Sequence, residues 1–182
     1  MLAYKGFAAG MVCRGYQFHQ GLNHTEQANC RANGFHCAEN PLDCLSYYSN
    51  LETSEYYLVN AGGDVDEDEI DSKIACTELT ILQRLDRRQF FLHALAYMVD
   101  HPTRKSSRHV VRDQATASCG YAVVRGQDPV ARGGKGDILA FAREDPATGK
   151  IVQISLTVVD GKKLRADRWY DIDFKERKGA EE

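Results

Sequence analysis

The segment GFHCAENPLDCLSYY, residues Gly34 to Tyr48, is the stretch from which the local fold and a site can be predicted. We expect a short buried strand that ends at Glu39 and Asn40 and turns directly into a helix. Asn40 suits an N-cap, because its side-chain oxygen can accept a hydrogen bond from a free backbone N–H group. Pro41 suits the first helical position, where its missing N–H group would have had no partner anyway. The segment therefore predicts a strand-to-helix turn.

This turn is a candidate binding site. A strand-to-helix turn exposes backbone N–H donors at the start of the helix, where anions and phosphates tend to bind. His36, Cys37 and Glu39 come immediately before the turn. The pattern indicates a site but does not name a reaction.

The composition is that of a globular chain with one large or two small domains. Its 182 residues are 43% hydrophobic and 27% charged, with a net charge of −3. This charge argues against a protein that holds nucleic acid through overall basicity. No apolar run approaches the roughly 20 residues of a membrane-spanning helix, and Met1–Tyr16 does not read as a signal peptide or anchor. We expect a cytoplasmic protein without membrane contact and without nucleic acid as a partner.

The six cysteines do not predict a metal site. None forms the C-x-x-C pair that makes a zinc prediction strong. Cys30, His36, Cys37 and Cys44 could supply four soft ligands, which is the weak alternative. Adjacent residues such as His36 and Cys37 would, however, point to opposite faces of a strand. Buried free thiols that act as small hydrophobic side chains are the favoured interpretation.

The chain is expected to divide into three parts and a tail. Residues 1–100 should form an N-terminal α+β domain of mixed strands and helix that ends with a helix at 87–100. The basic residues 101–117 should be a linker. Residues 118–175 should form a small antiparallel β meander, and residues 176–182 a disordered tail. The predicted fold class is therefore α+β.

Individual signals support these divisions. Asp86 can cap the helix 87–100, whose largely apolar surface must be covered by another element. The acidic stretch 62–71 should be a solvated loop rather than a calcium site. The sequences VVRG (Val123–Gly126) and VARG (Val130–Gly133) suggest the remnant of a β-solenoid turn. Asp160–Gly161 predicts a hairpin turn in the C-terminal part.

Four segments together resemble an uncharacterised family encoded by bacteriophages and prophages of gut-type bacteria. They are AYKGF (Ala3–Phe7), CRGYQF (Cys13–Phe18), NGFHCAENPLDCLSYY (Asn33–Tyr48) and DSKIACTEL (Asp71–Leu79). The ending DGKKLRADRWYDI (Asp160–Ile172) is similar to the C-terminal hairpin of that family. The resemblance implies a phage protein in an infected or lysogenic bacterial host, and it implies no particular activity.

The N-terminal part is also remotely similar to the NAD-binding core of ADP-ribosyltransferases. Lys5–Gly6 or Arg14–Gly15 would match the early strand that holds the adenosine side of NAD. Gly34 and Phe35, with Tyr47 or Tyr48, would match the turn that clamps the nicotinamide side. This similarity implies NAD or an ADP-ribose-like nucleotide as a possible ligand, and an ADP-ribosyltransferase-like core as a possible fold.

The catalytic carboxylate of those enzymes has no counterpart at the expected position. A strand-borne glutamate should fall near Ser72–Lys73, where neither residue is acidic. Glu55 and Glu78 are substitutes of uncertain register. The resemblance therefore favours nucleotide binding over catalysis, and it leaves the catalytic residues unknown.

Three functions remain open. The favoured one is a phage accessory protein that binds a host protein or a nucleotide, for example to inhibit a bacterial antiviral defence. The alternatives are an ADP-ribosyltransferase that uses NAD, and a virion or assembly component that packs against copies of itself as a homo-oligomer. The candidate ligand-binding residues are Lys5, Arg14, Gly34, Phe35, His36, Asn40, Tyr47 and Tyr48.

Overall fold

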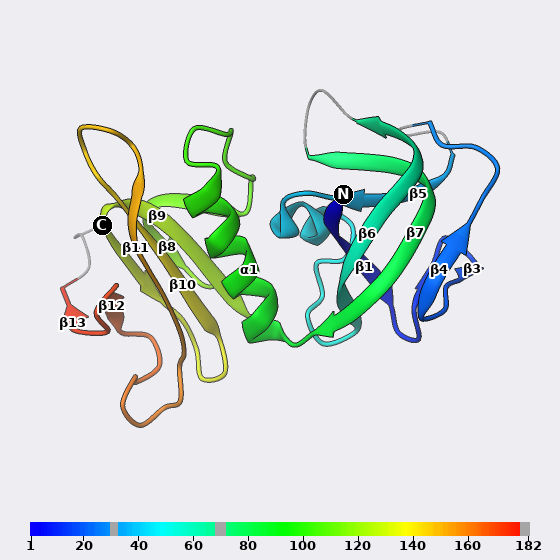
Figure 1. The fold of residues 1–182 in the computed structure, drawn as a ribbon. Helices are drawn as coiled ribbons and strands as arrows, with labels where there is room; N and C mark the ends of the chain where they lie inside the picture. Colours follow the sequence, from blue (N-terminus) through cyan, green and yellow to red (C-terminus); the bar gives the residue numbers. More distant parts are fainter. Residues whose placement is uncertain (30–32, 68–71, 179–182) are drawn as a thin grey trace. The chain divides into compact units, whose positions relative to one another are not determined.

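Two β-sheets make up most of the protein, and each belongs to its own unit (Figure 1). The first unit is Met1–Phe90 and the second is Phe91–Glu182. The computed structural model describes residues 1–29, 33–67 and 72–178. Cys30, the acidic residues 68–71 and the last four residues, 179–182, lie outside this range. No helix among the described residues is long and apolar enough to cross a membrane.

The first unit is built around a closed ring of four antiparallel strands. β1 pairs with β5 and β6, and β7 pairs with the same two strands. The short strands β2 and β3 extend the sheet beyond β1, and β4 pairs with β7. The strands are β1 (Leu2–Ala8), β2 (Val12–Cys13), β3 (Tyr16–Gln17), β4 (Gly21–His24), β5 (Phe35–Ala38), β6 (Ser54–Glu67) and β7 (Lys73–Leu85).

Alternating side chains of these strands fill the inside of the ring. Successive residues of a strand point to opposite faces, so Ala3, Lys5 and Phe7 of β1 share one face. Ala3 and Phe7 belong to a buried cluster that also includes Phe18, Phe35, Cys37, Tyr57, Val59, Ala61, Ile74, Cys76, Leu79 and Ile81. Lys5 therefore lies on the apolar face of its strand, and it is only 4% exposed.

The predicted strand-to-helix turn is present. β5 ends at Ala38, and a 3₁₀ helix, η1 (Pro41–Ser46), follows with Pro41 at its start. Asn40 is the N-cap, and its Oδ1 accepts a hydrogen bond from the backbone N–H of Leu42 at 3.1 Å. The cap prediction is confirmed. Six residues of 3₁₀ helix are too short for the anion site that we expected at the helix start.

The second unit combines one α-helix with a sheet that has both parallel and antiparallel pairs. β9 pairs in parallel with β8 and β10, while β11 and β12 pair antiparallel with β10 and β9. Residues 91–100 of α1 lie against this sheet, and the Phe91 and Tyr121 rings are 5.0 Å apart (Figure 1). The elements are α1 (Arg87–Asp100), β8 (Val110–Thr116), β9 (Tyr121–Arg132), β10 (Ile138–Glu144), β11 (Ile151–Val158), β12 (Trp169–Asp171) and β13 (Glu176–Arg177).

A buried ion pair lies within the second sheet. The Arg125 guanidinium donates to Glu144 Oε1 and, at 2.7 Å, to the carbonyl of Pro102. Arg112 bonds the other oxygen of Glu144 at 2.6 Å. Burial alone would raise the pKa of Glu144, but the hydrogen bonds from Arg125 and Arg112 lower it below its ordinary value. The carboxylate is therefore held in its charged form.

The predicted α+β fold class is wrong, because the chain is mainly β in both units. Val110–Thr116 falls in the expected linker but forms β8, since pairing with β9 outweighs the polar character of its sequence. The C-terminal part is not an antiparallel meander, since two of its strand pairs are parallel. The expected ADP-ribosyltransferase-like mixed core is likewise replaced by the closed ring of strands.

Four smaller expectations also differ from the structure. Asp64–Glu67 continues β6, with the side chains of Asp64 and Asp66 exposed, so the acidic stretch begins as a strand. Asp160–Gly161 does not close a hairpin, because β12 pairs with β9 and not with β11. The two VxRG copies both lie on the single strand β9, and the second copy extends just past the end of that strand. In the expected tail, Glu176 and Arg177 form β13.

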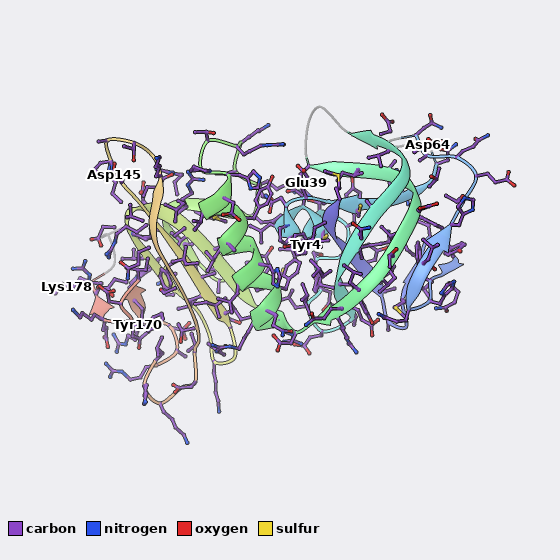
Figure 2. All side chains as sticks on the ribbon, viewed as in Figure 1. Tyr4, Glu39, Asp64, Asp145, Tyr170 and Lys178 are labelled. Atoms are coloured by element: carbon purple, nitrogen blue, oxygen red, sulfur yellow. The ribbon has the colours of Figure 1, made fainter. Side chains whose placement is uncertain are left out.

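The turn between β10 and β11 contains Asp145, which is labelled in Figure 2. Its Oδ1 accepts hydrogen bonds from the backbone N–H groups of Ala147 and Thr148.

Candidate functional site

A cavity of about 550 Å³ opens in the first unit. Its walls come from β1, the β2–β3 hairpin, β5, η1 and the first residue of β7. Seven of the eight predicted ligand-binding residues line it: Lys5, Arg14, Gly34, Phe35, His36, Tyr47 and Tyr48. The structure thus brings together residues that are up to 43 positions apart in the sequence (Lys5 to Tyr48). Asn40 does not line the cavity.

The cavity lies where two strands of the ring diverge. Within the described residues, β1 and β5 pair only at Tyr4 and Ala38. Continuing that register would place Gly6 opposite His36, but the strands do not pair there. The carbonyl of His36 instead accepts a hydrogen bond from the Lys5 ammonium. The Lys5 side chain therefore supplies the hydrogen bond that the backbone of β1 does not supply, at the point where β1 and β5 separate.

Lys5 is a buried cation without a carboxylate partner. Its Nζ lies 3.8 Å from the Cys13 thiol and about 5 Å from the centres of the Phe7 and Phe18 rings, at 5.2 and 5.0 Å. Among the described residues, no Asp or Glu lies within ion-pair distance of this ammonium. An ammonium has three donors, and burying a charge is costly unless it is paired. A bound anion would supply the missing partner.

Three aromatic rings form one wall. Tyr16, Phe18 and Phe35 contact one another with ring centroids 4.7 to 5.1 Å apart. Phe18 and Phe35 are buried, while Tyr16 is 42% exposed and so presents its ring to solvent. Aromatic rings bind other flat rings by stacking or edge-to-face contact. This wall was not predicted, although the alternation of Tyr16 and Phe18 in the sequence could have indicated it.

Arg14 enters the site from a tight hairpin. Arg14 and Gly15 connect β2 to β3 as a two-residue loop, and both have positive φ values, of 49° and 79°. This conformation is that of a type I′ turn, which suits the twist of the flanking strands. Glycine tolerates it, whereas Arg14 adopts it at some conformational cost. In the described part of the chain the Arg14 guanidinium has no hydrogen bond or ion pair.

The cations of the cavity surround His36. Burial lowers the pKa of His36, and the nearby charges of Lys5, Lys73 and Arg14 lower it further. Burial and the positive field that an anion would also experience therefore favour the neutral imidazole. Because Asp43 is the one carboxylate that lines the cavity among the described residues, positive charge prevails there.

Two tyrosines after η1 form the opposite wall. The Lys73 ammonium donates to the Tyr47 hydroxyl and lies 4.6 Å from the centre of its ring. Tyr48 packs its ring against Gly6, where an added Cβ would lie only 2.7 Å from Tyr48 Cδ2. Burial and a hydrogen bond with the Cys13 thiol raise the pKa of Tyr48. Tyr48 is therefore held as a neutral hydroxyl group.

Asp43 is fixed in place by the strand-to-helix turn. Its Oδ2 accepts from the Ser72 hydroxyl at 2.7 Å and from the Ser72 backbone N–H at 3.4 Å. The Ser72 hydroxyl oxygen in turn accepts from the Asn40 backbone N–H at 2.9 Å. Asn40 is thus a positioning residue, not a lining residue, of this cavity. Sequence reasoning did not find Asp43.

The two glutamates that could substitute for a catalytic carboxylate lie elsewhere. Glu55 accepts from the Met11 backbone N–H and pairs with Arg84 at 3.2 Å. Glu78 lies beside Gly62 and Gly63. Neither lines the cavity.

The cysteines near the site are free thiols. A hydrogen bond with Cys76, together with burial, raises the pKa of Cys37, and burial raises that of Cys44 to about 12. Within residues 1–29, 33–67 and 72–178, no three side chains of His, Cys, Asp or Glu gather in a way that could hold a metal. Cys30, one of the four alternative ligands, lies outside the described residues.

The fold and the cavity define a β-rich domain with an open pocket lined by cationic and aromatic side chains. The chain belongs to a family described as a domain of unknown function (DUF7666), whose model matches residues 1–93. The predicted membership of an uncharacterised family is thereby confirmed. The comparisons with curated proteins and with solved structures gave no significant match.

Proposed function

We propose that the first unit binds a small anionic ligand with a flat ring, of the nucleotide class, and does not transform it. The Lys5 ammonium carries this proposal, because it is buried at the cavity and has no carboxylate partner among the described residues. A phosphate group at Lys5 and Arg14 would offset the cost of that burial. The aromatic wall of Tyr16, Phe18 and Phe35 would contact the base.

The volume of the cavity agrees with this ligand class. Pockets for small molecules and cofactors typically measure about 300–1,000 Å³. A cavity of about 550 Å³ lies within that range and exceeds the needs of a lone phosphate ion. The mixture of apolar rings with a few cations also suits a ligand that is part aromatic and part charged.

We favour binding without turnover because the described part of the cavity offers no glutamate for catalysis. Asp43 is the carboxylate of the cavity among the described residues, and Ser72 occupies one of its oxygens. The ADP-ribosyltransferase alternative needs a glutamate at the reacting centre, and Glu55 is held by Arg84. We therefore assign no catalytic residues to the ADP-ribosyltransferase alternative.

The setting that we propose is a phage accessory protein in a bacterial host. This part of the proposal comes from the sequence resemblance to phage and prophage proteins. A protein that sequesters a nucleotide could blunt a bacterial defence that signals with one. The partner in this account is the nucleotide itself, and a host protein is the alternative partner.

A thermal-shift screen of the full chain tests the proposal. The panel is AMP, ADP, NAD, ADP-ribose, cyclic nucleotides and inorganic phosphate, each in a concentration series. A ligand at 100 times its Kd stabilises the folded state by about 2.7 kcal/mol, which gives a clear shift in Tm. We expect at least one nucleotide to raise Tm more than phosphate does. If no member of the panel raises Tm, nucleotide binding is wrong.

A further inference from the structure

Asp43 is an acceptor in a cavity where positive charge prevails. Carboxylates are costly at a site for anions, because they repel the phosphate that the cations attract. Asp43, which is itself a residue of η1, nevertheless lines this cavity, as Tyr47 does. No ion pair joins it to Lys5 in the described part of the protein. The Asp43 carboxylate therefore does not neutralise the buried Lys5 ammonium.

The carboxylate is oriented, and one of its oxygens is left for another donor. An ionised carboxylate oxygen has about two lone-pair sites. Oδ2 of Asp43 receives two N–H or O–H groups, both from Ser72, at 2.7 and 3.4 Å. Oδ1 receives no hydrogen bond from the described residues. Ser72 is held in turn by Asn40 at 2.9 Å.

This arrangement selects the type of group that Asp43 can bind. With Oδ2 already occupied, the carboxylate cannot offer both oxygens to the two parallel N–H donors of a guanine edge. It can accept from a single uncharged O–H or N–H group. A sugar hydroxyl is such a donor, and carboxylates bind ribose hydroxyls in other nucleotide sites.

We propose that Asp43 accepts a hydrogen bond from a ribose hydroxyl, so that the cavity selects ribonucleotides over their deoxy analogues. This inference rests on the proposed function and names the ligand subclass within it. The phosphate would lie toward Lys5 and Arg14, and the sugar toward Asp43. The turn at Asn40 then serves the site indirectly, by fixing Ser72 and hence Asp43.

The test is a calorimetric titration of the unmodified chain with ADP, 2′-deoxy-ADP, 3′-deoxy-ADP and pyrophosphate. A hydrogen bond to a charged group contributes roughly 1.5–3 kcal/mol, which corresponds to about tenfold or more in Kd. We expect one of the deoxy analogues to bind at least roughly tenfold more weakly than ADP. Pyrophosphate should bind more weakly than ADP as well. This comparison needs no variant and therefore does not depend on a variant folding.

Variants then assign the selectivity to Asp43. In Asp43→Ala, the Kd of ADP should rise to about that of the discriminated deoxy analogue, whose own Kd should stay nearly unchanged. Asp64→Ala is the matched control, because Asp64 is an exposed acidic residue of the same unit outside the cavity. Thermal denaturation verifies that both variants are folded.

The outcomes separate this inference from the proposed function. Equal affinity for ADP and both deoxy analogues overturns the ribose inference but leaves nucleotide binding intact. Retained selectivity in a folded Asp43→Ala variant also overturns it. If none of the three nucleotides binds, nucleotide binding and the ribose inference both fail.

Discussion

Asn40 shows how one residue can serve the fold and the site at once. Its side chain caps η1, while its backbone N–H holds Ser72 in contact with Asp43. The sequence predicted the cap, because an N-cap is a local feature of a few adjacent residues. It could not predict the link to Ser72, which depends on the pairing of β5 with β7 32 positions away.

Replacing Asn40 should therefore destabilise the protein. In Asn40→Ala we expect the free energy of unfolding to fall by about 1 kcal/mol, since an uncapped N–H group of Leu42 remains. Urea denaturation followed by circular dichroism measures the loss. Asn60→Ala is the control, because Asn60 is exposed on β6 and should change stability little. Equal loss in both variants would contradict the role of the cap.

His36 predicts a pH dependence. Its folded pKa is lowered by burial and by Lys5, Lys73 and Arg14, so the unfolded chain binds a proton more readily than the folded chain. Stability from this group is therefore fully present above the unfolded pKa of about 6.5 and falls as the pH drops toward the folded pKa. Urea denaturation at several pH values should show a weaker dependence in His36→Gln than in the unmodified chain. An unchanged slope would contradict this assignment.

At the scale of the elements, β5 and its turn require a glycine for close packing. Gly34 has φ of +86°, and an added Cβ would lie 2.7 Å from the Cα of Ala28. Gly34 was predicted as a ligand-binding residue, and it does line the cavity. The structure gives a further reason for glycine there, which is the approach of another backbone segment.

Comparing two glycines tests this reason. Gly15→Ala places a Cβ in open space at φ of +79° and should cost about 1–2 kcal/mol for the left-handed conformation alone. Gly34→Ala adds the clash with Ala28 and should cost more. Urea denaturation of the two variants gives the difference. A Gly34→Ala variant no less stable than Gly15→Ala would contradict the close approach.

The strands of the second unit illustrate why element prediction failed there. Three of the four exposed positions of β8 are polar or charged, namely Arg112, Asp113 and Thr116, which in isolation is typical of a linker. Its pairing partner β9 is the next strand along the chain, but the two strands pair in parallel, and parallel pairing cannot be recognised from a local turn signal. Strands were expected within residues 118–175, but the parallel pairing of β9 with β10 was not.

The Arg125–Glu144 pair should be important for the second unit. Both side chains are buried, and among the described residues Arg125→Met leaves Glu144 with the more exposed Arg112 as its remaining ion-pair partner. We expect Arg125→Met to lower the free energy of unfolding by about 3–5 kcal/mol. The double variant Arg125→Met/Glu144→Met should recover part of this loss. Additive losses in the two single variants and the double variant would contradict an energetic coupling.

For the whole molecule, local sequence patterns predicted which residues line the cavity better than they predicted the fold. Seven of the eight predicted site residues line one cavity, because they cluster in segments that form β1, the β2–β3 hairpin and the β5–η1 turn. The closed ring of strands depends on pairings between distant segments, such as β1 with β6, and was not predicted. Tyr16 comes from the local β2–β3 hairpin and Asp43 from η1, whereas Lys73 reaches the cavity through the distant pairing of β7 with β5.

The central claim is that a cationic cavity in the first unit binds a nucleotide. Calorimetric titration with ADP tests it most directly, in the unmodified chain and in two variants with one arginine replaced. Arg14→Gln removes a cation of the cavity, and Arg88→Gln removes an exposed cation of the same unit outside it. We predict a single site whose affinity falls in Arg14→Gln and is unchanged in Arg88→Gln. No binding to the unmodified chain, or equal weakening in both variants, would contradict the claim.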